Sequence, residues 1–303
     1  MRRKGDDSVL RFKAPSEGNY QVRISDVRGF GGEGFHYELK ARPPRPGFTI
    51  KHNMNAKKGL TVAPGTGREF LVTADRIDGF QGEIRVELTG LPKGFTSQPV
   101  TIEAGQIQAA GMIFAPERTG VGDLTAEDQP QGENPKSGES KGEKMKEMAE
   151  VQLVAMAAVG REEKSVPVGS AFPVSREEVI PELKVAIHPD GESGNPQKAE
   201  DGILELEIRP GETITAIVKA ERIDFKDRIT FGKENSGRNL AHGLIIDNIG
   251  LNGLMIPESK SEQRFFITAS KWVPESVRTF HLKTGEGGIT TEAIRIRVLP
   301  PAM

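Results

Sequence analysis

The segment Ala74–Val86, ADRIDGFQGEIRV, has a near copy much later in the chain, at Ala220–Phe231, AERIDFKDRITF. In both places a run of alternating apolar and polar residues leads into Arg-Ile-Asp, and a second alternating run follows after a short polar interval. A period of two is typical of a β-strand with one face in a core and the other in solvent. The repeated string therefore predicts two copies of one β-rich domain.

The same order of features surrounds each copy of the string. A strand-like run and a Pro-Gly turn precede it, at Pro64-Gly65 and Pro210-Gly211, and a Leu-x-x-Gly element follows it, at Leu91–Gly94 and Leu240–Gly243. Many short alternating runs separated by Gly and Pro turns favour antiparallel sandwiches. The sequence thus predicts an all-β fold with tandem immunoglobulin-like antiparallel β-sandwiches.

Length and composition divide the chain further. A chain of 303 residues has room for two or three domains of roughly 100–200 residues each, and its 35 Gly and 20 Pro suit short strands with many turns. We expect a partial β unit with a Pro-rich linker at residues 1–46, a first sandwich at 47–175 and a second, diverged one at 176–303. Residues 120–150 are rich in Gly, Glu, Lys, Ser and Pro, so they predict a disordered insert in the first sandwich.

Three motifs stand in the N-terminal part of the chain, namely Asp7-Ser8, Arg11–Pro15 and Gly18–Asp26. Together they resemble the C-terminal half of a bacterial pre-peptidase C-terminal domain, over Asp6 to Arg45. Apolar and polar residues alternate in the last motif, which predicts one of three short strands. The resemblance implies a non-catalytic attachment or targeting module that binds calcium or a polymeric substrate. It also implies an extracellular, periplasmic or cell-envelope location.

The stretch Gly90–Gln106, GLPKGFTSQPVTIEAGQ, is similar to the immunoglobulin-like repeats found beside such domains in large exported bacterial proteins. The second copy keeps Leu240, Gly243 and the order of strands, but it departs from the Pro-Val-Thr-Ile core of that pattern. It is therefore expected to be a diverged copy. The resemblance implies a spacing or display role for both sandwiches.

Charge, hydropathy and cysteine content exclude several classes of function. The net charge is -2 without a basic face, which argues against nucleic-acid binding. No apolar run reaches the roughly 18–20 residues that cross a bilayer, and an acidic pair follows the basic N-terminus where a signal peptide would be apolar. The chain has no cysteine, so it has no disulfide, thiolate nucleophile or cysteine-bound metal.

Motifs for enzymatic chemistry are weak or missing. GFGGEG at Gly29–Gly34 fits G-x-G-x-x-G, but a strand-like segment with prolines follows it instead of the helix that binds phosphate, so we expect a hairpin turn. No serine lies in a G-x-S-x-G elbow. The five histidines show no metal-ligand spacing: His36, His52, His188, His242 and His281. We therefore expect no catalytic residues and no enzyme.

Calcium needs only oxygen ligands from loops, and it is the one metal for which candidates exist. They lie in the N-terminal unit and in a later loop: Asp6, Asp7, Asp26, Asp190, Glu192 and Asn195. None matches the spacing of an EF-hand, and solvated turn carboxylates are the alternative interpretation. No other cofactor is expected.

Two further features have a structural and a functional interpretation. Asp78 and Asp224 recur in the two copies, and we expect a structural role, either a turn hydrogen bond or a pair with Arg76 and Arg222. Trp272, the single tryptophan, could stack on a sugar, or it could lie in a core or at the rim of a sandwich.

These observations favour a non-catalytic scaffold, adhesion or substrate-positioning region of an exported bacterial multidomain protein. One alternative is a carbohydrate- or calcium-binding module. Another is the accessory C-terminal part of a secreted peptidase whose catalytic domain lies upstream. The expected partners are other domains of the parent protein, an envelope protein or a polysaccharide, and not nucleic acid or a membrane span.

Overall fold

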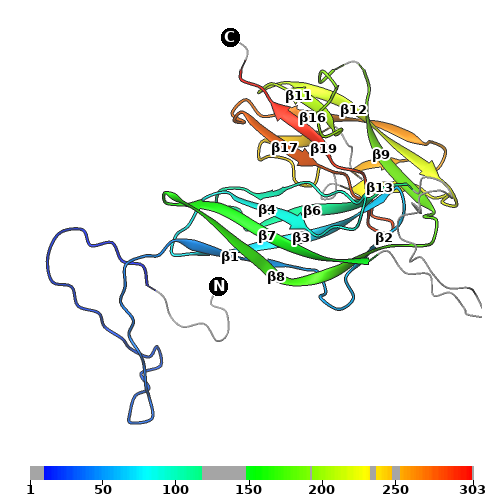
Figure 1. Ribbon diagram of the computed structural model, residues 1–303. Coiled ribbons are helices and arrows are strands. Elements are labelled where there is room, and N and C mark those ends of the chain that lie inside the picture. The colour runs from blue at the N-terminus through cyan, green and yellow to red at the C-terminus, as the bar shows by residue number, and fades with distance from the viewer. Residues whose placement is uncertain (1–9, 118–147, 192, 233–236, 248–252, 302–303) are drawn as a thin grey trace, which may run out of the picture. The chain divides into compact units, whose positions relative to one another are not determined.

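The fold is all-β, as the period-two pattern predicted (Figure 1). The computed structural model describes residues 10–117, 148–191, 193–232, 237–247 and 253–301. Strands β1 to β19 lie in this part of the chain and no helix does, so none of the described residues forms a helix that could cross a membrane. The predicted insert at 120–150 lies outside the described residues up to position 147, after which β7 begins.

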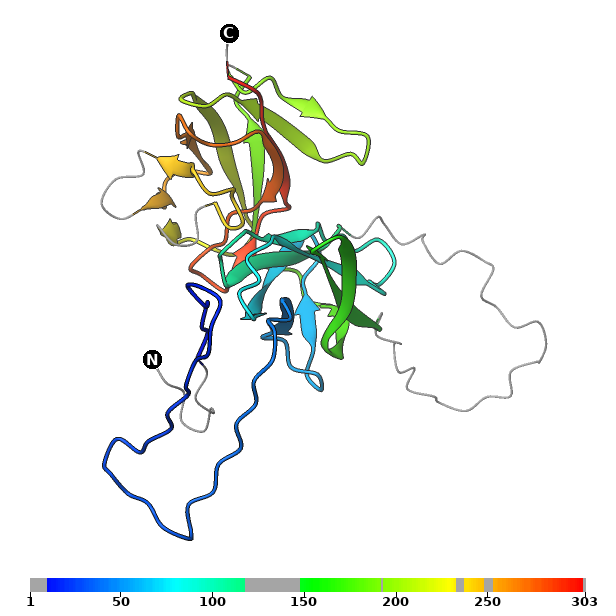
Figure 2. The same cartoon turned by 90° about the vertical axis from the view of Figure 1, so that its left-hand side faces the viewer.

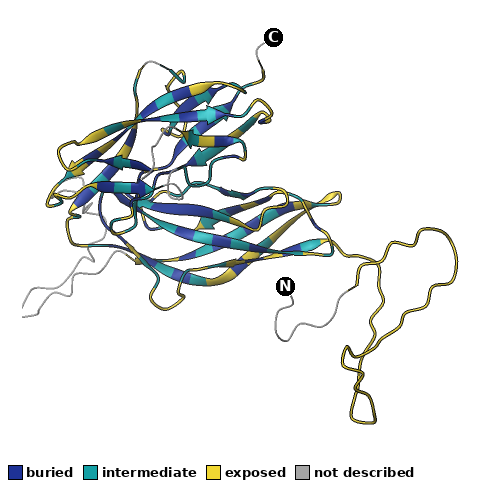
Figure 3. Ribbon diagram, turned by 180° about the vertical axis from the view of Figure 1, so that it is seen from behind, coloured by how far each residue is buried: buried dark blue, intermediate teal, exposed yellow. Residues whose placement is uncertain are grey.

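The chain divides into two units, residues 1–43 and 44–303. The described residues of the first unit, 10–43, form turns but no strand, which corrects the prediction of three short strands there. They are exposed along their whole length, Tyr20 and Ile24 included (Figure 3). Alternation gives a segment one apolar face, but a strand also needs partner strands and a core against which that face can pack.

The first sandwich has two facing sheets. In one, β3 pairs with β1 and β6; in the other, the order is β2-β8-β7-β4-β5. All pairs are antiparallel except β2 with β8. The bounds are β1 Gly47–His52, β2 Leu60–Val62, β3 Thr66–Ile77, β4 Ile84–Thr89, β5 Val100–Ile102, β6 Gln108–Ala115, β7 Met148–Val159 and β8 Glu162–Arg176.

The second sandwich repeats this plan. One sheet has the order β14-β16-β12-β9 and another β10-β11-β19-β17, with β13 and β15 as a separate pair. Here β11 and β19 are the parallel pair, as β2 and β8 are in the first copy. The bounds are β9 Leu183–Pro189, β10 Gln197–Lys198, β11 Leu204–Ile208, β12 Thr213–Arg222, β13 Ile229–Gly232, β14 Leu244–Asp247, β15 Leu254–Ile256, β16 Glu262–Ala269, β17 Ser276–Phe280 and β19 Ile294–Val298.

The Pro-Gly turns make the same bond in both copies. The Gly65 N–H donates to the Ala115 carbonyl at 2.9 Å, and the Gly211 N–H donates to the Ala269 carbonyl at 2.9 Å. Gly65 and Gly211 have φ of 70° and 83°, a conformation that glycine adopts without steric cost. The sequence repeat is therefore a repeat of backbone hydrogen bonding as well.

The arginine of the first Arg-Ile-Asp element donates hydrogen bonds to three loop carbonyls. Arg76 donates from Nε to Gln106 O at 2.9 Å, from Nη1 to Gly82 O at 2.6 Å and from Nη2 to Glu103 O at 2.7 Å. Its guanidinium also lies over the Phe80 ring, 5.5 Å from the centroid. A planar fork of five N–H groups can reach several acceptors at once, which an ammonium group cannot.

Arg222 does the same in the second sandwich. It donates from Nε to Lys260 O at 3.1 Å, from Nη1 to Asp227 O at 2.6 Å and from Nη2 to Pro257 O at 2.9 Å. Its guanidinium lies 5.9 Å from the centroid of the Phe225 ring. The repeated string encodes this clamp, which explains why the chain contains it twice.

The repeated aspartates form hydrogen bonds with the segment just before the first strand of each sandwich. The Asp78 carboxylate accepts a hydrogen bond from the Arg45 backbone N–H at 2.8 Å, and the Asp224 N–H donates to the Glu182 carbonyl at 3.1 Å. Asp78 has a φ of 49°, in the left-handed region that Asp tolerates better than most residues. The Asp78 side chain therefore has the expected structural role, whereas the Asp224 bond uses the backbone alone.

Each sandwich has a hydrophobic core of its own. The core of the first lies between Phe48 and Val174 in the chain, and that of the second between Leu183 and Val298. The predicted alternation is visible in β3, where Phe70 and Val72 are fully buried. The opposite face of β3 is therefore free to meet the second sandwich.

The second copy contributes one strand to the first. β18, Ile289–Thr290, lies between β17 and β19 but pairs antiparallel with β3, Ile289 opposite Arg68 and Thr290 opposite Gly67. In Figure 2 the orange-red part of the chain reaches the blue and cyan sheet of the first sandwich. The two sandwiches thus share a sheet, which the sequence pattern did not indicate.

Candidate functional site

The junction of the two sandwiches contains a buried cluster of charged side chains around Glu69 of β3. The Glu69 side chain is 4% exposed. It accepts hydrogen bonds from Arg238 Nε at 2.7 Å and Nη2 at 3.0 Å, from Lys283 Nζ at 3.1 Å, and it lies 3.3 Å from His281 Nε2. The three partners belong to the second sandwich, so this one carboxylate of the first sandwich contacts three side chains of the second.

The environment keeps Glu69 ionised. Burial by itself would raise the pKa of the carboxyl, but the hydrogen bonds from His281 and Arg238 and the Arg238 charge outweigh it and lower the pKa to about 2. His281 has a 2% exposed side chain, and burial lowers its pKa below the ordinary 6.5 in spite of the nearby carboxylate. The imidazole is therefore neutral at neutral pH, with its Nε2–H toward Glu69, because a carboxylate can only accept.

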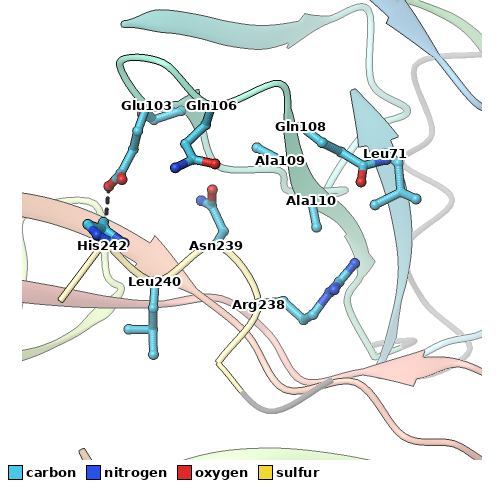
Figure 4. A pocket seen from close by; sticks show the side chains of 11 residues that line it. Leu71, Glu103, Gln106, Gln108, Ala109, Ala110, Arg238, Asn239, Leu240 and His242 are labelled. Carbon is cyan, nitrogen blue, oxygen red and sulfur yellow. Dashed lines mark hydrogen bonds between the residues drawn. The ribbon is translucent and has the colours of Figure 1, made fainter. Parts of the chain in front are cut away.

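A cleft of about 300 Å³ lies beside this cluster (Figure 4). Its lining combines side chains of β3, β5, the β5–β6 loop and β6 with the 238–242 segment of the second sandwich: Leu71, Thr101, Glu103, Gln106, Gln108, Ala109, Ala110, Arg238, Asn239, Leu240 and His242. In Figure 4 the amides of Gln106 and Asn239 extend toward each other from the two sandwiches. The cleft is thus formed only when both copies are present.

Hydrogen bonds hold the 238–242 segment in place. Arg238 and His281 form a backbone bridge, with N–H to carbonyl distances of 2.9 and 3.2 Å. The Asn239 amide donates to Thr279 O at 2.9 Å, and the His242 N–H donates to Glu103 Oε1 at 2.9 Å. Asn239 has a φ of 69°, in the left-handed region. The segment is fixed by both sandwiches and is not a free loop.

Trp272 lies at the surface beside the cleft, which decides against a place in the core. Its side chain is 60% exposed, and its ring contacts that of His242 with centroids 5.0 Å apart and an interplanar angle of 47°. A Cβ on Gly243 would come within 3.0 Å of the indole, so glycine at this position leaves room for the ring. His242 lines the cleft, so the aromatic pair extends from its rim.

The calcium candidates of the N-terminal unit have one described member. Asp6 and Asp7, and Glu192 of the later loop, lie outside the described residues. Asp26 is exposed, and its Oδ1 accepts hydrogen bonds from the backbone N–H groups of Arg28 at 2.8 Å and Phe30 at 3.2 Å. Such a bonding pattern is that of a turn carboxylate.

The other two candidates bond to the second sandwich. The Asp190 side chain is buried, accepts a hydrogen bond from the Thr215 hydroxyl and lies 3.6 Å from Arg264 Nε. The Asn195 amide donates to Glu207 Oε2 at 2.6 Å. In the part of the chain that the structure describes, no three His, Asp or Glu side chains come together as a metal-binding group.

The glycine-rich motif at Gly29–Gly34 contains turns. Gly29 has a φ of 74° and donates its N–H to the Asp26 carbonyl at 3.1 Å, and Gly32 has a φ of 137°. Neither a helix nor flanking strands adjoin these turns in residues 10–46. The expected turns are therefore present, whereas the strands of the expected hairpin are not formed.

The Glu69 cluster is not predicted by the sequence pattern. A glutamate on the outward face of a strand is expected to be exposed to solvent. His281 is one of five histidines that show no metal-ligand spacing, and nothing in this pattern indicates a partner for it. One signal was present: His281 and Lys283 stand two residues apart, so a strand would place both on one face. Two such groups indicate an acidic partner, but they do not identify it.

Comparisons with known proteins leave the family open. No family model matches the chain, and no curated protein matches it. Among solved structures, domains 4–9 of the surface layer protein SbsC match at a TM-score of 0.25 and 14% identity, over 85% of this chain and 32% of that chain. The E. coli chaperone DraB matches at a TM-score of 0.24 and 12% identity, over 82% of this chain and 97% of that chain. Likenesses at these scores do not extend to function.

Proposed function

We propose that this chain is a non-enzymatic spacer and positioning region of an exported bacterial multidomain protein. Its two sandwiches would act as one stiff body that holds neighbouring domains or partners at a fixed distance and orientation. The observation that carries this proposal is the junction, in which β18 of the second copy completes a sheet of the first beside the buried Glu69 cluster.

Several contacts support stiffness at the junction. Sandwiches joined by a linker move relative to one another by default unless their interface is extensive. Here residues 177–182 alone separate β8 from β9, and further polar contacts flank the Glu69 cluster. These contacts are Arg278 Nη2 to Glu83 Oε2 at 2.6 Å, Lys184 Nζ to Glu117 Oε1 at 2.6 Å and the His242 N–H to Glu103 Oε1 at 2.9 Å.

The chemistry of the cluster supports a role without catalysis. A histidine paired with a carboxylate also occurs in catalytic triads, where the imidazole reaches a nucleophile and the substrate. In this protein His281 is 2% exposed, and Arg238 and Lys283 bind the same carboxylate. His281, Arg238 and Lys283 surround the Glu69 carboxylate, so the cluster suits a structural role. The exported, bacterial setting rests on the resemblances of the N-terminal unit and of Gly90–Gln106.

The distance between two spin labels, one on each sandwich, tests the proposal. The chain has no cysteine, so cysteines introduced at the exposed positions Lys57 and Lys226 take the labels selectively. We expect a single narrow distance distribution, as narrow as that of the control pair Lys57 and Lys93 within the first sandwich. A broad or multimodal distribution for the pair across the junction would exclude the spacer function.

The cellular setting needs its own measurement. Antibody detection of the native protein in medium, envelope and cytoplasmic fractions of the source cells is expected to place it outside the cytoplasm. Detection in the cytoplasm alone would remove the exported part of the proposal and leave the stiffness unaffected.

A further inference from the structure

We propose that the cleft between the two sandwiches binds a neutral saccharide, with Trp272 and His242 as an aromatic platform at its rim. This goes beyond the spacer role, because a stiff body needs no ligand site.

The platform is the exposed indole. Trp272 is the only tryptophan of the chain and is 60% exposed, although an indole is among the side chains that gain most from burial. Its indole packs against the His242 ring and against the backbone at Gly243. An indole face offers a flat apolar surface, as the C–H face of a pyranose ring does, and its N–H is left to donate a hydrogen bond.

The lining offers amide groups. Gln106 and Gln108 come from the first sandwich and Asn239 from the second. An amide carries two donors and an acceptor, and a sugar hydroxyl is both donor and acceptor, so the two kinds of group match. Leu71, Ala109 and Ala110 add apolar side chains to the lining. Polar groups that converge on one cleft are the groups that fix the orientation of a bound small molecule.

The charges of the lining are engaged by the protein itself. The Arg238 guanidinium binds Glu69 at two points, and Glu103 accepts the His242 N–H. An anionic sugar would compete with Glu69 for the arginine and approach the Glu103 carboxylate. A neutral sugar needs neither change. The lining therefore favours neutral over acidic saccharides.

The cleft is preformed. The backbone bridge between Arg238 and His281 and the Asn239 bond to Thr279 fix the second-sandwich wall, while β3 and β6 form the other. Asn239 lies in the left-handed region, which Asn tolerates better than most residues, and its amide bond to Thr279 O holds it there. A rigid site loses little entropy on binding. At about 300 Å³ the cleft holds a short part of an oligosaccharide.

The single tryptophan makes a direct binding test possible, because selective tryptophan excitation reports on Trp272 alone. The probes are maltotetraose, cellotetraose, chitotetraose and mannotetraose, with tetragalacturonate as the acidic member. We expect saturable emission changes with at least one neutral probe at millimolar concentration or below, and calorimetry on the full chain then gives the affinity.

Variants locate the site. Trp272→Ala is expected to weaken binding about tenfold or more, since tryptophans dominate binding energies where they contact a ligand, and Gln108→Ala about threefold or more. Gln263→Ala removes a glutamine of β16 that does not line the cleft and is expected to leave the affinity unchanged. Circular dichroism of each variant establishes that it is folded, and Gln108→Ala keeps the test valid if Trp272→Ala is not.

Three results would overturn the proposal: no saturable binding of any neutral probe at millimolar concentration, binding of the acidic probe alone, or unchanged affinity in both cleft variants. The spin-label distance across the junction does not depend on Trp272, so failure of the saccharide site and failure of the spacer function are separable.

Discussion

The Glu69 carboxylate and the Arg238 guanidinium, 169 residues apart in the chain, form a two-point ion pair across the sandwich junction, with 2.7 Å from Oε2 to Nε and 3.0 Å from Oε1 to Nη2. A buried pair of this kind stabilises little relative to apolar side chains of the same shape, but loss of one partner leaves the others uncompensated. Its main effect is therefore on geometry, because the charges are satisfied in one arrangement of the two sandwiches.

Replacing Glu69 by glutamine is expected to lower the free energy of unfolding by about 3–5 kcal/mol, because Arg238 and Lys283 lose their buried counter-ion. We also expect calorimetry to show one unfolding transition for the two sandwiches in the wild type and two transitions in the variant. The matched control is Glu87→Gln, whose pair with Arg85 is exposed on β4 and should contribute less than about 1 kcal/mol. Equal effects of the two substitutions would argue against a special role of the cluster.

Acid should weaken the junction through Glu69. Its pKa is about 2 in the folded protein and 4.5 ordinarily. The ionised carboxylate therefore makes its full contribution to the free energy of unfolding above pH 4.5, and this contribution is lost as the pH falls toward 2. The difference between the two pKa values corresponds to about 3 kcal/mol of stability. Denaturant unfolding across this range measures it as wild type minus Glu69→Gln, since other carboxylates titrate alike in both. A difference that stays constant with pH would contradict the assignment.

A second acid effect should begin at higher pH. Because burial lowers the pKa of His281 below 6.5, the unfolded chain binds a proton there before the folded protein does. The free energy of unfolding must then fall as the pH drops below 6.5, and His281→Gln should reduce this slope to the part that comes from His188, whose pKa burial also lowers. A proton NMR titration of the His281 ring provides the direct check: protonation at or above 6.5 in the folded state would refute it.

The arginine clamps should be equivalent in the two copies. Arg76→Lys and Arg222→Lys keep the charge but lose the fork that reaches three carbonyls, so each should cost about 3 kcal/mol in urea unfolding. Arg85→Lys, at an exposed site, is the control and should change little. A large loss of stability in one copy alone would mean that the two arginines do not contribute equally to the free energy of unfolding.

Gly67 should be required for β18 to pair with β3. A Cβ there would overlap the Thr290 hydroxyl and come within 2.6 Å of Met112 Cε, so Gly67→Ala should destabilise by about 1–3 kcal/mol. Hydrogen exchange at the β18 amides should become faster, because the strand must move away. Gly47→Ala, where a Cβ meets only Arg45 O at 4.0 Å, is the control. Unchanged exchange at β18 would show that the strand tolerates the added methyl.

The elements that sequence predicted well are those set by short-range pattern. Phe70 and Val72 alternate with polar residues, and a period of two leaves β3 one apolar face whatever surrounds it. The Pro-Gly turns and the Arg-Ile-Asp elements repeat in order, so their equivalence could be recognised before any coordinates. Residues close together in the sequence determine such turns and strands, so the sequence predicts them.

The same pattern was insufficient where a partner decides the outcome. Tyr20 and Ile24 alternate as regularly as Phe70 and Val72, yet residues 10–43 form no strand because no core covers them. Glu69 points outward from β3, as predicted for a polar residue, but the groups that bury it lie more than half the chain away. Trp272 was compatible with either a buried or an exposed place, and its contact with His242 depends on the turn at Gly243.

The placement of β18 has a consequence for the ancestry of the chain. A single sandwich taken from this pair would lose either a strand it receives or the sheet to which it lends one, and it would expose unpaired backbone groups that invite aggregation. A genetic rearrangement that moved one copy alone would therefore leave a sheet incomplete, so we expect the two copies to be inherited as one piece.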